Sequence, residues 1–257
     1  MIRRVIEAVG HELLALVQFA GEIVYLLVET VRYVISGAIS PRQTIQQMGD
    51  VGFSSLPIVL ITVGFSGMVL ALYTASEFLK FGAGSYVGGL VGLSLAREIG
   101  PVVTAVVVAA RVGSAMAAEL GTMKVTEQID ALRSLATSPV EFLVVPRFLA
   151  CLTMLPLLVV LASTTGTLAG GLVAVYSGLA WAQYVHSIRE LVDLQDFVCG
   201  VVKAIPFAII ISTIGCQQGL STQGGAAGVG RATTSAVVLC IIAIYAADFF
   251  LSTILPR

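Results

Sequence analysis

The chain has 257 residues, of which 57% are apolar and only 11% are charged, and its mean hydropathy is +0.98. Soluble domains carry about 25% charged residues, and a water-soluble globule of this size has too much surface to hide so much apolar material. The same composition excludes intrinsic disorder, and a net charge of −1 excludes attraction to nucleic acid. The composition therefore indicates an all-α membrane protein that crosses the bilayer several times.

Residues 1–40 are predicted to form an amphipathic helix that lies in the membrane interface. Acidic residues interrupt the continuous apolar run that a cleaved signal peptide needs. Pro41 is expected to end this helix, and residues 42–52 are expected to form a polar joint that leads into the first span. The apolar positions recur every three or four residues and include Val5, Val9, Leu13, Leu16 and Ile23.

Five further stretches are long and apolar enough to cross the bilayer as helices, which takes about 20 residues each. Residues 41–257 are therefore predicted to form one five-span domain. An excess of Lys and Arg on one side favours a cytoplasmic N-terminus and a C-terminus on the opposite side. The spans are expected near residues 55–79, 87–120, 148–178, 197–219 and 234–255.

The second predicted span carries charged residues, each of which costs about 2.5–3.5 kcal/mol to place at membrane depth. Arg97 and Glu98 either line a polar patch in a substrate cavity or form an internal salt-bridge network, with Lys203 of the fourth span as a partner. Arg111 and Glu119 lie nearer the cytoplasmic end of the span. A structural role is favoured for this second pair.

Between the second and third spans, a short amphipathic helix is predicted near residues 125–136. Thr126 is expected to cap this helix, and Leu135 to end its apolar stripe with Val125, Ile129 and Leu132. An ordinary interfacial loop helix is the simpler interpretation. A polar face with both charge signs also suits docking of a cytosolic partner, and its outward-facing residues are Glu127, Gln128, Asp130 and Arg133.

Two glycine-containing segments bear on the course of the chain. The span at 87–120 is too long for the bilayer as a straight helix, so it must tilt, protrude or break at Gly100–Pro101. The segment Gly224–Gly230 is expected to be a cytoplasmic turn, because it lacks the pattern of a phosphate-binding loop. Isolated cysteines and histidines give no metal-binding pattern.

The sequence contains no nucleotide-binding motif. Energy for uphill transport must therefore come from a partner or an ion gradient.

Several runs of residues together resemble the signature of the MlaE permease family, and the similarity spans nearly the whole chain. The block at 95–132 is the most specific part of this resemblance. The runs are LAREIGPVVTA at 95–105, ARVGSA at 110–115, AELGTM at 118–123, TEQIDAL at 126–132, PRF at 146–148 and GVGRATT at 228–234.

This resemblance implies the permease subunit of an ABC transporter that moves phospholipids between the inner and outer membranes of a bacterial envelope. It implies a chain without enzymatic activity or a cofactor of its own, since ATP is bound by a partner subunit. The implied partners are a second copy of the chain, two cytosolic ABC ATPase subunits, an MCE-domain lipid-binding hexamer and a STAS-domain protein. The implied location is the inner membrane, with the N-terminus in the cytoplasm and the C-terminus in the periplasm.

Site residues follow from the resemblance position by position. Arg97 is expected to meet a lipid phosphate, and Lys203 to balance Glu98. The helix near 125–136 corresponds to the coupling helix that docks on the ATPase through Glu127, Gln128, Asp130 and Arg133. The expected lining of the lipid cavity is Arg97, Glu98, Leu70, Tyr73, Thr74 and Lys203.

Two other classes of function remain as alternatives at this stage. An ion-coupled secondary carrier for an apolar substrate needs intramembrane carboxylates, and Glu98, Glu119 and Asp248 are candidates. A purely structural membrane scaffold needs none of these groups. An ATPase that co-purifies with the chain distinguishes the first alternative, and co-purifying lipid distinguishes the second.

Overall fold

A computed structural model describes the backbone of residues 2–37 and 39–255, and the side chains of that part except for residues 2–13, 15 and 16. In this described part every regular element is a helix, so the all-α prediction is confirmed. Five helical segments are long and apolar enough to cross a membrane, which agrees with the predicted number.

The first spanning segment comprises α2 (Pro41–Met48), the π-helical turn η1 (Gly49–Phe53) and α3 (Leu56–Lys80). The second comprises η2 (Gly84–Tyr86), α4 (Val87–Ser94), η3 (Leu95–Ile99), α5 (Gly100–Val108), η4 (Ala109–Gly113) and α6 (Ser114–Val125). The third comprises η5 (Val140–Val144) and α8 (Val145–Tyr176), and the last two are α10 (Leu194–Leu220) and α11 (Gly225–Ile254). Outside these segments lie α1 (Ile2–Ile35), α7 (Gln128–Ser134) and α9 (Trp181–Leu191).

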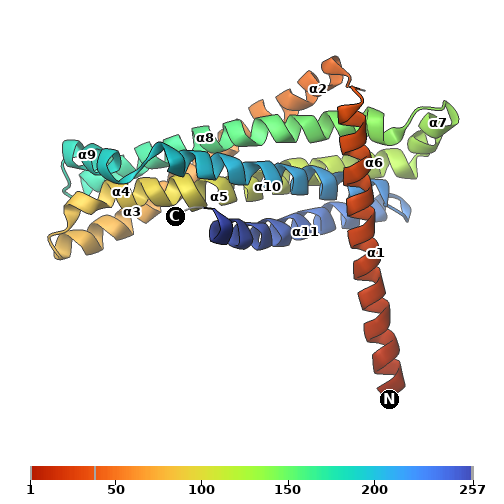
Figure 1. The fold of residues 1–257 in the computed structure, drawn as a ribbon, viewed down its shortest axis with the longest axis horizontal. Helices are drawn as coiled ribbons and strands as arrows, with labels where there is room; N and C mark the ends of the chain where they lie inside the picture. Colours follow the sequence, from red (N-terminus) through yellow and green to blue (C-terminus); the bar gives the residue numbers. More distant parts are fainter. Residues whose placement is uncertain (1, 38, 256–257) are drawn as a thin grey trace.

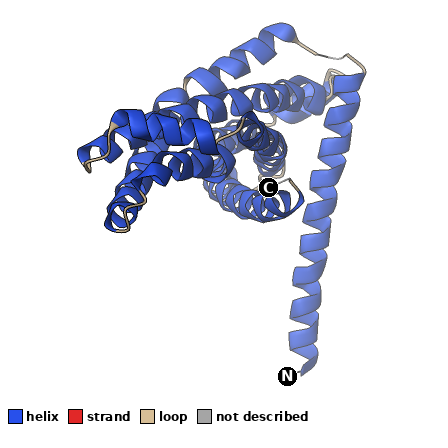
Figure 2. Ribbon diagram, turned by 60° about the vertical axis from the view of Figure 1, so that its left-hand side comes forward, coloured by secondary structure: helices blue, strands red, loops and turns tan. Residues whose placement is uncertain are grey.

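The long helices lie side by side and alternate in direction, as Figure 1 shows. The central helices α8 and α10 pack on each other, α3 packs on α8, and α11 packs on α10 and α6. The segments with the smallest buried share are the first and the last, so α3 and α11 form the outside of the bundle. The α7 end of the bundle also carries α1 and α2, whereas α9 lies at the opposite end (Figures 1 and 2).

Helix α1 runs across the bundle instead of along it (Figure 1), which is the orientation expected of a helix in the membrane interface. Leu26 and Thr30 are buried against the bundle, whereas Tyr25 and Val28 on the same helix are exposed. The side chains of Val5, Val9, Leu13 and Leu16, which define the start of the predicted apolar stripe, lie outside the described part.

The joint after α1 differs from the prediction, because residues 41–48 form a helix and not a polar connection. Helix α1 ends at Ile35, and Pro41 begins α2 instead of ending α1. Proline suits the first turn of a helix, where its missing N–H has no intrahelical partner. The predicted Gly-rich turn is also wrong, since α11 begins at Gly225, and the left-handed conformation is confined to Gly224 and Gly225, at φ 85° and 65°.

The connection between the third and fourth spans contains α9, which the sequence analysis did not predict. Tyr184 of this helix is buried, and its hydroxyl donates a hydrogen bond to the carbonyl of Thr167 at 2.9 Å. Burial raises the pKa of the Tyr184 phenol. Apolar residues recur every three or four positions in residues 181–191, at Trp181, Tyr184, Ile188 and Leu191, and this spacing was the available signal for an amphipathic helix.

Close packing of α3 on α8 depends on small residues at the crossing point. A Cβ atom added at Gly67 would overlap the carbonyl oxygen of Gly166 on the facing helix. Small residues allow such backbone approaches in lipid, where van der Waals packing replaces the hydrophobic effect between helices. This pair therefore sets the distance between the first and third spans.

We expect Gly67→Ala to lower the free energy of unfolding by about 1–3 kcal/mol, because the new methyl group has no space. The measurement is the thermal unfolding midpoint of the detergent-purified protein. Gly230→Ala is the matched control, since a Cβ at that helical position meets no atom within 4 Å. Equal unfolding midpoints for both variants would contradict the crossing-point assignment.

Candidate functional site

A π-helical turn holds Arg97 and Glu98 about a third of the way along the second span. Pro101 has no N–H, so the carbonyl four residues before it has no α-helical partner. Just before the proline, the N–H of Gly100 bonds to the carbonyl of Leu95, five residues earlier, which is the pattern of a π-helical turn. The Ser163 hydroxyl donates to the same carbonyl at 3.2 Å. The helix therefore continues through Gly100–Pro101 without a break, so of the three predicted outcomes for this overlong span the break is wrong, and tilting and protrusion stay predictions.

Lys203 of α10 is the centre of a charged cluster between three helices. Its ammonium group donates to Glu98 Oε2 at 2.6 Å, to Asp248 Oδ1 at 3.0 Å and to the Ser252 hydroxyl at 2.8 Å. The Lys203 side chain is only 2% exposed. These three acceptors use all three protons of an ammonium group, so the cluster fixes α10 and α11 against the second span.

A glycine lets α10 approach closely enough for this contact. A Cβ atom at Gly200 would overlap the carbonyl oxygen of Ala96, just before the charged pair of the second span. Lys203 lies three residues further along the same helix, which is nearly one turn. The predicted pairing of Lys203 with Glu98 is thus present in the structure as an ion pair.

Arg97 is held by a different carboxylate. Its Nε lies 3.0 Å from Asp196 Oδ1, and its Nη2 lies 4.0 Å from Cys199 Sγ. Asp196 also accepts a hydrogen bond from the N–H of Asp193 at 2.8 Å, as part of a reciprocal capping box at the start of α10. Sequence analysis missed Asp196 and Ser252. The D-x-x-D pattern before an apolar run was the signal for Asp196, and Ser252 left none.

The cluster lies deep in the spanning region. Lys203 is about 14 Å along α10 from its first residue, and Glu98 is about 17 Å from the start of α4, at 1.5 Å per residue. Both starts are at the α9 end of the bundle (Figure 1). Charges at this depth cannot face hydrocarbon cheaply, yet 47% of the Glu98 side chain is exposed in the single chain.

The other predicted cavity residues lie apart from this cluster. Leu70, Tyr73 and Thr74 are on α3, which packs mainly on α8 and to a smaller extent on α4, α5 and η3. None of the described hydrogen bonds or ion pairs joins these three residues to the cluster, which lies between η3, α10 and α11. Leu70 packs partly against the core, the Thr74 hydroxyl bonds to the Leu70 carbonyl at 2.8 Å, and Tyr73 is exposed. One chain therefore does not bring the two groups of predicted residues together.

The second charged pair has the structural contacts that the sequence analysis favoured. Glu119 accepts from the buried Arg147 at 2.8 Å, and Arg111 donates to the Ser55 hydroxyl at 2.9 Å and to the Asp50 carbonyl at 3.1 Å. Glu119, Glu98 and Asp248 were the candidates for ion coupling. Each of the three carboxylates has a basic partner in the structure.

The short helix predicted near residues 125–136 is present as α7, although its ends differ from the prediction. Glu127, not Thr126, is its N-cap, at φ 62°, and the Thr126 hydroxyl bonds back to Thr122 at 2.8 Å. Leu135 follows the helix and is 75% exposed, because Ala136 adopts φ 58° and turns the chain away. Ile129, on the inner side of α7, is buried. Because Leu135 is exposed, the apolar stripe of this helix is shorter than predicted.

The polar face of α7 points into solvent as predicted. Asp130 lies between two basic groups, 3.2 Å from Lys124 Nζ and 3.3 Å from Arg133 Nη1. The Gln128 side chain donates to the Thr126 hydroxyl at 3.1 Å, and both Glu127 and Gln128 are exposed. The face therefore presents both charge signs on a helix whose inner side is anchored.

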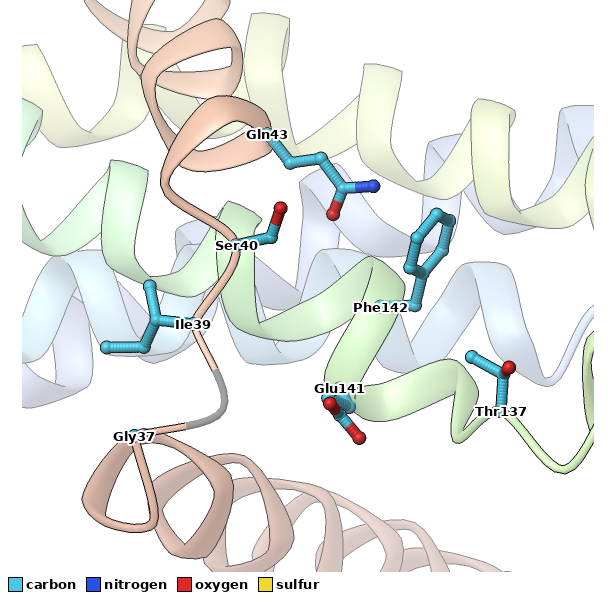
Figure 3. A pocket seen from close by; sticks show the side chains of 7 residues that line it. All are labelled: Gly37, Ile39, Ser40, Gln43, Thr137, Glu141 and Phe142. Atoms are coloured by element: carbon cyan, nitrogen blue, oxygen red, sulfur yellow. The ribbon is translucent and has the colours of Figure 1, made fainter.

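A cavity of about 220 Å³ lies near the junction of α1 and α2. Figure 3 shows Ser40, just before α2, and Gln43 of α2 on one side of the cavity, with Phe142 and Thr137 on the other. The side-chain oxygen of Gln43 is buried there without a hydrogen-bond partner. This cavity is at the α7 end, so it is separate from the charged cluster around Lys203.

We expect Lys203→Met to lower the free energy of unfolding by about 3 kcal/mol, since it leaves the Glu98 and Asp248 carboxylates without their cation. Thermal unfolding of the purified chain measures this loss. Lys80→Met removes a lysine from an exposed pair with Glu77 and is the control, with an effect of about 0.5 kcal/mol or less. Adding Asp248→Asn to Lys203→Met should restore part of the loss, and an unchanged midpoint for Lys203→Met would exclude a stabilising cluster.

Comparisons with known proteins agree with the geometry. The family model described as Permease MlaE matches residues 44–254. A probable ABC transporter permease protein of Synechocystis is 49% identical over 222 residues, covering 86% of this chain and 84% of the relative. A probable ABC transporter permease protein of Rickettsia typhi is 38% identical over 256 residues, covering 99% of each chain.

A plant relative is also similar to this chain. The chloroplastic protein TRIGALACTOSYLDIACYLGLYCEROL 1 of Arabidopsis thaliana is 40% identical over 227 residues, which are 88% of this chain and 65% of that protein. The family model covers most of the five spanning segments, including the charged cluster and α7. This chain therefore belongs to the MlaE permease family, as a membrane-embedded permease subunit of the ABC transporter type.

Proposed function

We propose that this permease moves phospholipids between the inner and outer membranes of a bacterial envelope and so maintains lipid asymmetry. ATP is bound and hydrolysed by a separate cytosolic ATPase, and the permease itself holds no cofactor. The observation that carries the proposal is a half-exposed carboxylate, Glu98, at membrane depth in an ABC permease. A plant relative named after a galactolipid supports a lipid substrate.

The exposure of Glu98 supports a cavity formed by two copies of the chain. A charged group at this depth normally faces water or a partner charge, and 47% of this side chain has no cover within one chain. In a homodimer that encloses a polar cavity, Glu98 is hydrated. The exposed side chain of Tyr73 on α3, an outer helix, then also belongs to the cavity wall.

Lipid would enter this cavity with its acyl chains on apolar walls and its headgroup at the charged cluster. Leu70 and Thr74 of α3 lie about 15 and 9 Å from the end of that helix at Lys80, near the depth of the cluster. Arg97 is the residue that faces the lipid phosphate, and it does so in competition with Asp196. Lys203 holds Glu98 in place and is a positioning residue.

The coupling to ATP hydrolysis runs through α7. Its polar residues Glu127, Gln128, Asp130 and Arg133 would fit a groove of the ATPase, and closure of two ATPase subunits would push two such helices together. This movement collapses the cavity and shifts the lipid to or from an MCE-domain hexamer. A STAS-domain protein completes the proposed assembly.

The proposed orientation follows from the positive charges at the α7 end. Basic residues at cytoplasmic connections orient membrane proteins, and the α9 end carries fewer of them, chiefly Lys80 and Arg189. This places α1 and α7 at the cytoplasmic face of the inner membrane, and it sends α11 toward the periplasm. The basic residues at the α7 end are Arg32, Arg42, Lys124, Arg133, Arg147 and Arg231.

The lipid site is tested by Arg97→Gln combined with Glu98→Gln. We expect the double variant to transfer phospholipid at least about tenfold more slowly, because loss of a headgroup interaction of about 1.4 kcal/mol gives this factor. The measurement is lipid transfer by the reconstituted complex, with bound phospholipid measured by mass spectrometry. Wild-type transfer and wild-type lipid content in this variant would exclude the assigned site.

The docking surface is tested by charge reversal at Asp130. We expect Asp130→Arg to reduce co-purification of the ATPase at least about tenfold, because it places a third positive charge beside Lys124 and Arg133 and so reverses the charge pattern of the docking face. Glu190→Arg on α9, also an exposed carboxylate, is the control at the opposite end. Retention of the ATPase by the Asp130 variant, with unchanged folding, would show that α7 is not the docking element.

A further inference from the structure

The charged cluster is unequal in sign, and its exposed member is acidic. Within the described part of the chain, three carboxylates form ion pairs with two cations of this cluster: Asp196 with Arg97, and Glu98 and Asp248 with Lys203. With every group ionised, the cluster carries one more negative than positive charge. A ligand that replaces water at this place therefore gains by bringing a positive charge.

The cluster offers its acid to a ligand more readily than its bases. The Glu98 side chain is 47% exposed, against 22% for Arg97 and 2% for Lys203. The Lys203 ammonium already donates to three oxygens at 2.6–3.0 Å. An incoming phosphate would have to displace carboxylates from these bases, whereas an incoming ammonium meets a half-exposed carboxylate, whose two oxygens each lie 3.3 Å from the Ser252 hydroxyl.

We propose that this site selects phospholipids whose headgroup carries a primary ammonium, which binds Glu98 while the phosphate lies toward Arg97. The inference rests on the proposed lipid-transport function and deepens it. A zwitterionic aminophospholipid satisfies both faces of the cluster. An anionic headgroup such as glycerol phosphate has no ammonium group to bind Glu98 and adds a net negative charge to a cluster that already carries one, so it is disfavoured.

The test is competition between phosphatidylethanolamine and phosphatidylglycerol for the full-length permease in mild detergent, quantified as bound lipid by native mass spectrometry. We expect wild type to prefer the ethanolamine lipid by about fivefold, the upper range for a half-exposed ion pair. Glu98→Gln should reduce the preference to about one. Glu77→Gln, an exposed acid at the end of α3, is the matched control and should keep the wild-type preference.

A second variant guards against a general disturbance of the cluster. Asp248→Asn removes one negative charge next to Lys203 and leaves the carboxylate of Glu98 in place, so it should keep part of the preference. Free ethanolamine in excess should not displace the lipid, because it lacks acyl chains. Displacement by free ethanolamine would overturn the assignment to a lipid.

The outcomes separate the two levels of the proposal. Equal binding of both lipids to wild type, or a preference that survives Glu98→Gln, would overturn the headgroup selectivity and leave lipid transport standing. Absence of any bound phospholipid would overturn the proposed function itself. A preference for phosphatidylglycerol would show that Arg97, and not Glu98, dominates the site.

Discussion

The structure depends on the cost of placing charge inside a membrane. Lys203 lies about a third of the way along α10, and it is tolerated there because two carboxylates and a hydroxyl surround its ammonium group. The same contacts join the second, fourth and fifth spanning segments. This contact depends on the close approach at Gly200, on the π-helical turn before Pro101 and on the position of α11. Removing the cation leaves two acids in the interior, so the charged group organises the packing around it.

Much of the fold was predictable from hydropathy alone, because length and apolarity define a spanning helix. The five spans and the Glu98–Lys203 pairing agree with the structure. Sequence reasoning failed where the tertiary register decides, as it did for Asp196, which reaches Arg97 from another helix. It also failed at local turns such as Gly224–Gly225, where only the backbone conformation separates a turn from the start of a helix.

The function rests on a different balance of evidence. Composition and pattern indicate a transporter-like membrane protein with a docking helix, and the family is established by sequence similarity across residues 44–254. The structure adds the distribution of charge within the site. It assigns Arg97 and Lys203 to carboxylate partners, so the phosphate contact expected from the sequence competes with existing ion pairs. Accessibility of a charged group is a property of the folded chain and leaves no mark in a linear motif.

The second spanning segment is one helical rod of 42 residues, with α7 attached two residues after its end. Glu98 and Val125 are therefore about 40 Å apart along the same helical segment. A tilt of about 5° around one end displaces the other by about 3.5 Å, at 1.5 Å per residue. Added to the 2.6 Å between Glu98 and Lys203, that displacement exceeds the limit of about 4 Å for an ion pair, so a small rotation about the α7 end is large enough to open it.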